Sequence, residues 1–210
     1  MIQLNNISKH FGLQVLFDEL DFLIGKGERI GFVGRNGSGK STLFKIILGE
    51  LEADSGEIVI PKGYKIGALD QHINFTKPTV LEECCQVLSE EEQYDWWKAE
   101  RILFGLGFCE EDLEKDPASF SGGYQVRINL TKALVQNPNL LLLDEPTNYL
   151  DIVSLRWLRV FLTTFKGEVL LITHDRDFMD SVTTHTAGLS RKRLNKYKGD
   201  TAKFYEQLTI

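Results

Sequence analysis

Gly34-Arg35-Asn36-Gly37-Ser38-Gly39-Lys40-Ser41 is the stretch of this sequence that decides the fold. It fits the pattern GxxxxGK[ST], and it stands between a predicted strand, residues 29–33, and a predicted helix, residues 40–48. Glycines let main-chain N–H groups turn inward around phosphate oxygens, and the N-terminus of the following helix adds partial positive charge on the same side. The alternative is a glycine-rich turn before an ordinary helix, but this context favours a phosphate-binding loop.

The residue types in the loop predict how it holds a nucleoside triphosphate. Lys40 is expected to reach the β- and γ-phosphates, and Ser41 is expected to bind Mg²⁺. We therefore predict ATP and Mg²⁺ as cofactors. The predicted ATP-binding residues of this segment are Gly34, Arg35, Asn36, Gly37, Ser38, Gly39, Lys40, Ser41 and Thr42.

Length and composition exclude several classes of protein. The chain has 210 residues, 42% hydrophobic and 26% charged, which suits one globular α/β domain. It contains no apolar run near the roughly 20 residues that cross a bilayer and no signal-peptide pattern, so we expect a cytoplasmic protein. The three cysteines are odd in number, which predicts free thiols. The net charge of −6 argues against a protein that coats nucleic acid over its whole surface.

Apolar segments alternate with helical patterns from end to end, without an internal repeat or a Pro/Gly/Ser-rich linker, so we expect a single domain over residues 1–210. The first seventy residues or so are rich in predicted strands, and the last part alternates helix and strand as a parallel sheet requires. The predicted strands are residues 2–7, 15–24, 29–33, 57–60, 64–69, 140–143 and 168–173, and the predicted helices lie at 40–48, within 79–108, at 122–136 and after 151.

Leu140-Leu141-Leu142-Leu143-Asp144-Glu145 ends a predicted strand in two acids. The continuous apolar run suits a strand buried on both faces of a parallel sheet, and ligands bind at the carboxyl edge of such sheets. Asp144 is expected to hold Mg²⁺ through its water shell, and Glu145 is expected to polarise the attacking water. The alternative is an acid pair that caps a strand end, but the upstream phosphate loop favours catalysis.

His174 follows the next predicted strand, residues 168–173. A lone histidine is more often structural. Its position at a strand end, in a chain that already carries a phosphate loop, favours a role in sensing the γ-phosphate. We therefore predict Glu145 and His174 as catalytic residues.

These motifs, in this order, resemble the nucleotide-binding domain of the ATP-binding cassette (ABC) superfamily over essentially the whole chain. The resemblance implies a P-loop NTPase fold with a mainly parallel sheet core, an N-terminal antiparallel β subdomain and a small helical subdomain at about residues 79–136. It also implies a Mg²⁺-dependent ATPase. ATP in that family is sandwiched head to tail between two cassettes, so a second cassette is expected, either in the same polypeptide or as a second copy.

The resemblance gives roles to further residues. Gln71 stands at the Q-loop glutamine, which contacts Mg²⁺ and the attacking water, and Phe11 stands at the aromatic residue that stacks on adenine. Ser121-Gly122-Gly123 resembles the signature motif, which caps the γ-phosphate held by the facing cassette, and Leu150-Asp151 resembles the D-loop. An aromatic residue near an N-terminal strand is otherwise usually part of the core. The predicted metal contacts are Ser41, Gln71 and Asp144, and the predicted catalytic set is Glu145, His174 and Gln71.

The signature segment departs from the usual family pattern at two places. Phe120 replaces the usual Leu, and Tyr124-Gln125 stand where a single Gln normally follows the glycines. Residues 124–127, together with residues 144–151 and 173–178, resemble the soluble ABC-F branch. Members of that branch act on ribosomes, so the resemblance implies a ribosomal partner and no membrane partner. Members of that branch join two cassettes by a long charged linker. Tyr197-Lys198-Gly199-Asp200, with Tyr205, resembles the segment that leads to this linker, which implies an N-terminal cassette with the linker starting near 200–210.

Three functional hypotheses follow from this resemblance. The first is an ATP-driven clamp on the ribosome, with rRNA and tRNA as neighbours. The second is the ATPase subunit of a membrane transporter, with a coupling helix in a groove beside residues 79–108. The third is an ATP-dependent scaffold without chemistry, against which the intact Glu145 and His174 argue. The basic segment Arg191-Lys192-Arg193, with Lys196 and Lys198, fits either contacts with rRNA phosphates or a solvated hairpin.

Overall fold

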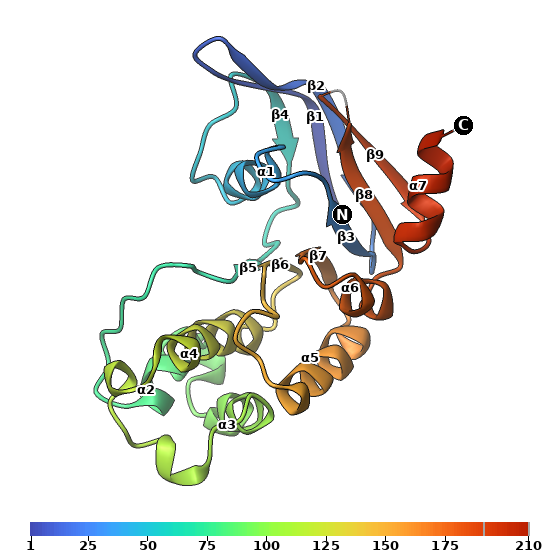
Figure 1. Ribbon diagram of the computed structural model, residues 1–210. Coiled ribbons are helices and arrows are strands. Elements are labelled where there is room, and N and C mark those ends of the chain that lie inside the picture. Colours follow the sequence, from blue (N-terminus) through green and yellow to red (C-terminus); the bar gives the residue numbers. More distant parts are fainter. Residues whose placement is uncertain (191, 210) are drawn as a thin grey trace.

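The computed structural model describes residues 1–190 and 192–209 as two β-sheets with helices packed around them (Figure 1). The smaller sheet is antiparallel and has the strand order β2-β1-β4. Its strands are β1 (Ile2–Phe11), β2 (Gln14–Ile24) and β4 (Ser55–Val59). Ile2, Leu4 and Ile7 of β1 are fully buried, so one face of this sheet packs on the core, as is common in antiparallel sheets.

The larger sheet has the strand order β5-β6-β7-β3-β8-β9 and is parallel except at β9. Its strands are β3 (Arg29–Val33), β5 (Ile66–Ala68), β6 (Leu140–Asp144), β7 (Glu168–Ile172), β8 (His185–Ser190) and β9 (Arg193–Lys198). Asp144 and Ile172 are register partners, so the chain leaves β6 and β7 side by side. The loop after β3 leaves the same edge because these three strands are parallel.

The helices cover both faces of the larger sheet. They are α1 (Lys40–Ile47), α2 (Val80–Cys85), α3 (Trp96–Gly105), α4 (Gly122–Val135), α5 (Ile152–Thr164), α6 (Arg176–Val182) and α7 (Thr201–Thr209), with 3₁₀ turns at Glu90–Glu92, Glu110–Asp112 and Pro117–Ser119. Helices α2, α3 and α4 gather at one end, away from the antiparallel sheet, whereas α1 lies beside that sheet (Figure 1). Within the described residues, no helix is long and apolar enough to span a membrane.

Strand β6 separates two hydrophobic cores. Leu140 and Leu142 belong to the core shared with α1 and the antiparallel sheet, whereas Leu141 and Leu143 belong to the core shared with α2 to α6. All four side chains are at most 1% exposed. The alternation follows from the two-residue period of a strand, and it explains why the predicted strand has no polar face.

The predicted fold is confirmed: a mainly parallel core, an antiparallel N-terminal sheet and a group of helices. Strand β1 runs past the predicted residue 7 to Phe11, through register shifts that follow the left-handed residue Asn6 (φ 51°). The strand predicted at 64–69 is shorter, Ile66–Ala68, because Tyr64 closes a turn in which its amide donates to the Pro61 carbonyl over 3.1 Å. Helix α6 was not predicted. The cysteines are free thiols, as predicted, with Cys84 and Cys85 buried and Cys109 exposed.

Candidate functional site

The loop between β3 and α1 has the geometry of a phosphate cradle. Gly37 and Gly39 have φ angles of 79° and 100°, in the left-handed region that glycine adopts without strain. A Cβ at Gly39 would lie 2.8 Å from Phe17 Cε1 and 2.9 Å from Leu16 Cδ2 of β2, so this position requires glycine for space as well. Because Gly39 is also the N-cap of α1, the positive end of the helix dipole opens into the loop.

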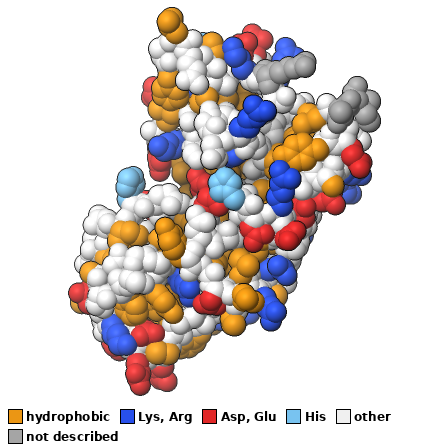
Figure 2. Space-filling model, in the orientation of Figure 1, with side chains coloured by type: hydrophobic (Ala, Val, Ile, Leu, Met, Phe, Trp, Pro, Cys, Tyr) orange, Lys and Arg blue, Asp and Glu red, His pale blue; other side chains and the backbone are white. Residues whose placement is uncertain are grey.

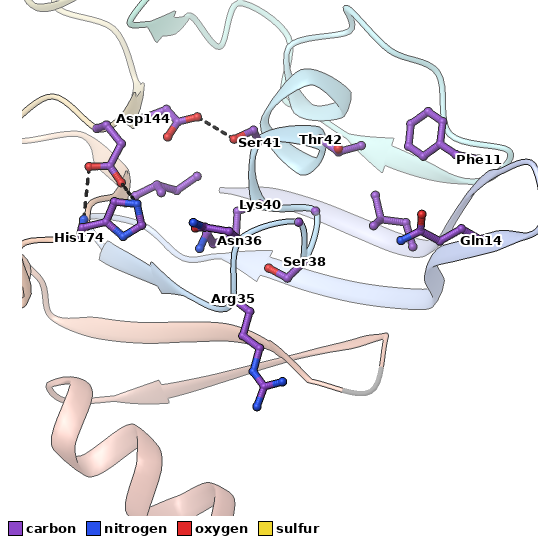
Figure 3. Close-up of a pocket in the computed structure, with 15 residues that line it drawn as sticks. Phe11, Gln14, Arg35, Asn36, Ser38, Lys40, Ser41, Thr42, Asp144 and His174 are labelled. Carbon is purple, nitrogen blue, oxygen red and sulfur yellow. Dashed lines mark hydrogen bonds and ion pairs between the residues drawn. The ribbon is translucent and has the colours of Figure 1, made fainter. Parts of the chain in front are cut away.

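The loop forms one wall of a cavity of about 600 Å³, within the range of small-molecule sites. The cavity is lined by Phe11, Gln14, Leu16, Arg35, Asn36, Gly37, Ser38, Gly39, Lys40, Ser41, Thr42, Asp144, Glu145, Ile172 and His174. Figure 3 shows Asp144 and His174 at one end of the cavity and Phe11 and Gln14 at the other, with the loop between them. The predicted loop residues, acids, histidine and aromatic residue are therefore brought together, although they come from distant parts of the chain.

Lys40 lies at the carboxylate end of this cavity. Its Nζ donates a hydrogen bond to the Gly34 carbonyl over 2.6 Å. Burial lowers the pKa of Lys40 below its usual value, while the nearby carboxylates of Glu145 and Asp144 act in the opposite direction. The site thus places an ammonium group beside two acids, an arrangement suited to a polyphosphate that arrives with a divalent cation.

Ser41 and Asp144 bring together the oxygen atoms that suit Mg²⁺. Ser41 Oγ donates to Asp144 Oδ2 over 2.8 Å, and Gln71 Nε2 donates to the Asp144 carbonyl over 2.9 Å. A hydroxyl and a carboxylate are hard oxygen ligands, and Mg²⁺ in nucleotide sites completes its shell with water and phosphate. The donor set therefore fits Mg²⁺. Gln71, the third predicted metal contact, bonds the main chain of Asp144, and it is not among the described residues that line the cavity. Within residues 1–190 and 192–209, no cluster of three or more His, Cys, Asp or Glu side chains forms an all-protein metal site.

Glu145 and His174 are paired across the ends of β6 and β7. Glu145 Oε1 lies 3.3 Å from His174 Nε2, and the His174 amide donates to Glu145 Oε2 over 3.3 Å. Glu145 has a φ of 52°, a conformation that costs energy for a non-glycine residue and that is common at functional sites. Its amide is held by the Ile172 carbonyl over 2.8 Å. On the face drawn in Figure 2, an acidic and a histidine side chain lie side by side near the middle.

Phe11 lies at the far end of the cavity and is 51% exposed, with Lys9 Nζ 5.4 Å from its ring centroid. It is therefore a surface aromatic residue at a cavity rim and not part of the core. The sequence did not predict Gln14, Leu16 or Ile172 in the lining. Gln14 is the register partner of Phe11 in the β1–β2 hairpin. The predicted place of Phe11 beside adenine is therefore the one signal that could have pointed to Gln14.

Three predicted features differ from the residues described so far: the signature segment, the Arg35 side chain and the basic segment. The wall of the cavity, as far as the described residues show, does not include Ser121-Gly122-Gly123, which begins helix α4. Arg35 lines the cavity, but its side chain turns away from the other loop side chains (Figure 3). The third feature, the basic segment, is only partly described, because Arg191 lies outside the described residues. Lys196 of β9 binds Glu28, the residue before β3, with 2.6 Å between Nζ and Oε2.

A phosphate cradle at the carboxyl edge of a parallel sheet, faced by two acids from a neighbouring strand, is the architecture of P-loop ATPases. Comparison with known proteins narrows this class to one family. Residues 17–148 match the family described as "ABC transporter", so the chain belongs to the ABC family. Cassettes of this family bind and hydrolyse ATP, and this chain is such an ATPase cassette.

Several relatives align with nearly the whole chain. "Putative ATP-binding protein YdiF" of Bacillus subtilis (strain 168) is 35% identical, and the alignment covers 99% of this chain and 39% of that protein. "Probable ATP-binding protein YheS" of Escherichia coli (strain K12) is 31% identical, with coverage of 99% of this chain and 37% of that protein. "Uncharacterized ABC transporter ATP-binding protein YfmM" of Bacillus subtilis (strain 168) is 32% identical, with coverage of 98% of this chain and 48% of that protein. The chain thus spans less than half the length of these relatives.

Two solved structures have the same fold. One is described as the "ATP binding subunit of ABC transporter", with a TM-score of 0.82, 22% identity and complete coverage of both chains. The other is a dimeric post-hydrolysis state of an ATP-binding cassette bound to ADP and Pi, with a TM-score of 0.75, 25% identity and coverage of 94% of this chain and 98% of that one. The similarity to the first structure shows the fold alone. The second structure is of a cassette in a post-hydrolysis state.

Proposed function

We propose that this chain binds Mg²⁺-ATP in the cavity beside Ser41 and hydrolyses it after closing on a second cassette. In this proposal Lys40 binds the β- and γ-phosphates, and Ser41 and Asp144 hold the metal, with Gln71 beside them. Glu145 acts as the base for the attacking water, and His174 senses the γ-phosphate. The single observation that carries the proposal is the convergence of Lys40, Ser41 and Asp144 on one cavity that opens at a helix N-terminus.

Phe11 completes the proposed nucleotide site. Its exposed ring stands at the opposite end of the cavity from the acids, which is where the base of a bound nucleotide would lie if its phosphates occupy the loop. We propose that Phe11 stacks on adenine, and that the main chain of residues 34–42 holds the phosphates. The side chain of Arg35 contributes less, because it turns away from the loop.

A second cassette is the proposed partner. Ser121-Gly122-Gly123 lies outside the wall of this chain's own cavity, which is the placement needed if it serves the nucleotide of a facing cassette. The cassette bound to ADP and Pi is dimeric. We further propose that residues 1–210 form one cassette, with a helical subdomain at about 79–136 and the start of an interdomain linker near 200–210. The greater length of the relatives leaves room for a second cassette.

We propose a cytoplasmic role as an ATP-driven clamp on the ribosome, in the manner of the ABC-F branch. The support is the resemblance of residues 124–127, 144–151 and 173–178 to that branch, together with alignment of almost the whole chain to YdiF and YheS. Binding of two ATP molecules would favour the closed state, and hydrolysis would release it, because a ligand shifts an equilibrium only by its differential affinity for the two states.

The test is co-sedimentation with ribosomes. The Glu145→Gln protein, in its full natural length, should pellet with ribosomes in the presence of ATP and Mg²⁺. It should bind ATP but not hydrolyse it, so it should not be released from the ribosome. The matched control is the double variant Lys40→Ala/Glu145→Gln, which should stay in the supernatant. A Glu145→Gln protein that pellets equally with and without ATP, or only with membranes, would remove the ribosomal clamp from consideration.

A transporter ATPase is the second candidate, and one surface favours it. A cavity of about 370 Å³ lies between α3, α4 and α5 and is lined largely by apolar and aromatic side chains, among them Trp97, Ile102, Trp157 and Phe161. Such a surface could receive a helix of a membrane partner. Pelleting of the Glu145→Gln protein with membranes, and not with ribosomes, would favour this alternative.

A further inference from the structure

We propose that Arg127 is a positioning residue that ties the signature segment, residues 121–123, to the segment after β6, residues 149–151. It would thereby present both segments to the second cassette as one rigid surface. The inference rests on the proposed closure of two cassettes, because it concerns the surface of this chain that would meet the second cassette. It names Arg127 as the residue that sets the shape of that surface.

Arg127 is 5% exposed, and its guanidinium binds oxygen atoms from separate segments. Nη2 donates to the Tyr149 carbonyl over 2.7 Å, and Nη1 donates to the Leu106 carbonyl over 2.7 Å. Nη1 also lies 3.2 Å from Asp151 Oδ2, and the same carboxylate caps α5 by accepting the Ser154 amide at Oδ1 over 2.9 Å. One side chain on α4 therefore joins the end of α3 to the start of α5.

Gly123 of the signature segment lies close to Tyr149. A Cβ added at Gly123 would lie 3.1 Å from Tyr149 Cβ, closer than most real Cβ contacts. Tyr149 has a φ of 64°, which is uncommon for a bulky residue, and its side chain is 70% exposed. Its own burial therefore does little to hold this conformation. The hydrogen bond from Arg127 to its carbonyl is a constraint that keeps Tyr149 against Gly123.

The two departures from the usual signature pattern pack around this arginine. The Arg127 Cζ lies 4.5 Å from the centroid of the Tyr124 ring, a cation–π geometry. Tyr124 in turn contacts Phe108, with centroids 5.1 Å apart, and Phe108 contacts Phe120, with centroids 5.5 Å apart. Phe120 and Tyr124 are thus parts of one aromatic cluster, and this cluster holds one face of the guanidinium.

The turn after α3 leaves room for the same group. Gly107 has a φ of 92°, and a Cβ there would lie 2.8 Å from Arg127 Nη1. A lysine at position 127 would keep the positive charge, but its compact ammonium group lacks the planar fork that reaches several acceptors and stacks on a ring. Arg127→Lys therefore removes the positioning and spares the charge, which makes it a sharper test than alanine.

The first measurement is ATP-driven dimerisation of the chain in the Glu145→Gln background. Analytical ultracentrifugation over a range of protein concentrations gives the dimer dissociation constant. Arg127→Lys should raise the dimer dissociation constant by about tenfold or more, because a hydrogen bond of a charged group is lost. Affinity of the monomer for a fluorescent ATP analogue should change by less than about twofold, since Arg127 is outside the cavity wall. Tyr124→Phe should behave like the parent and Tyr124→Leu should weaken the dimer. Arg156→Lys, an exposed site on α5, is the matched control.

The second measurement does not depend on dimerisation. Amide hydrogen exchange of the monomer should become faster in residues 121–126 and 147–152 together in Arg127→Lys, while exchange in α1 stays as in the parent. Exchange in Arg127→Lys that is unchanged in both segments would overturn the role of Arg127. If the Glu145→Gln parent dimerises with ATP, an equal dimer dissociation constant in Arg127→Lys would overturn it as well. A Glu145→Gln chain that does not dimerise with ATP would instead count against closure between copies of this chain, and the exchange result would then decide the role of Arg127.

Discussion

Ser41 Oγ donates a hydrogen bond to Asp144 Oδ2 over 2.8 Å, although the two residues are 103 positions apart in the chain. The bond joins the first turn of α1 to the last residue of β6. It brings together a hydroxyl and a carboxylate, which are hard oxygen ligands of the kind that would hold Mg²⁺. This pair is therefore the most direct place to test the metal site.

Asp144→Asn should reduce the contribution of Mg²⁺ to ATP binding. We expect the ratio of ATP affinities with and without Mg²⁺ to fall by about 10–100-fold, the usual cost of disturbing a group that supports a metal. Isothermal titration calorimetry in Mg²⁺ and in EDTA measures both affinities. Asp177→Asn, an exposed acid in α6, is the control and should leave the ratio unchanged. An unchanged ratio in Asp144→Asn would mean that the metal is held elsewhere.

Lys40→Ala should weaken ATP binding itself. Hydrogen bonds of charged groups contribute about 1.5–3 kcal/mol, so the dissociation constant for Mg²⁺-ATP should rise by roughly 10–150-fold. The control is Lys45→Ala, an exposed lysine on the same helix, which should bind ATP like the parent. Equal affinities for both variants in calorimetry would contradict the contact between Lys40 and the phosphates.

Glu145→Gln should separate binding from turnover. The amide keeps the size of the side chain but cannot take a proton, so kcat should fall by about 10²–10⁴ while the affinity for ATP is retained. Phosphate release, measured over a range of protein concentrations, gives kcat, and Glu50→Gln at an exposed position is the control. Turnover equal to that of the parent would mean that another group acts as the base.

Glu83→Gln should destabilise the fold in a pH-dependent way. Glu83 is fully buried and accepts hydrogen bonds from Lys132 Nζ over 2.7 Å and from the Thr76 and Lys77 amides over 2.9 Å. Burial alone raises the pKa of Glu83, but the bonds from Lys132 and the two amides outweigh it and lower the pKa below its usual value of 4.5. Its stabilising contribution is therefore complete above pH 4.5 and is lost as the pH falls through the lower, folded-state pKa.

At pH 7, urea unfolding should give Glu83→Gln a free energy of unfolding about 3 kcal/mol lower than that of the parent. The difference between the two proteins should shrink as the pH falls below the usual glutamate pKa. The neighbouring Glu82→Gln is the control and should change little. A difference between Glu83→Gln and the parent that does not vary with pH would show that packing, and not the charge, is responsible.

Local motifs predicted much of the candidate site. Residues 34–41, the acids after β6 and His174 after β7 each carry a pattern within a few positions, and all of them line the cavity or bond to its lining. Gln14 and Leu16 could not be found in this way, because they line the cavity only through the packing of β2 over Gly39. Helix α6 was missed because its seven residues are too few for a clear helical period.

The sequence by itself determined the class of the protein, since a strand, a glycine-rich octet and a helix start specify backbone geometry and charge within a dozen or so residues. It also determined that residues 140–143 form a strand buried on both faces, because an apolar run without alternation has no solvent face. Only the tertiary structure decided that Ser41 meets Asp144, that Arg35 turns away from the loop, and that Tyr124 lies under Arg127. These contacts depend on strand order and helix packing between distant segments, which no local pattern encodes.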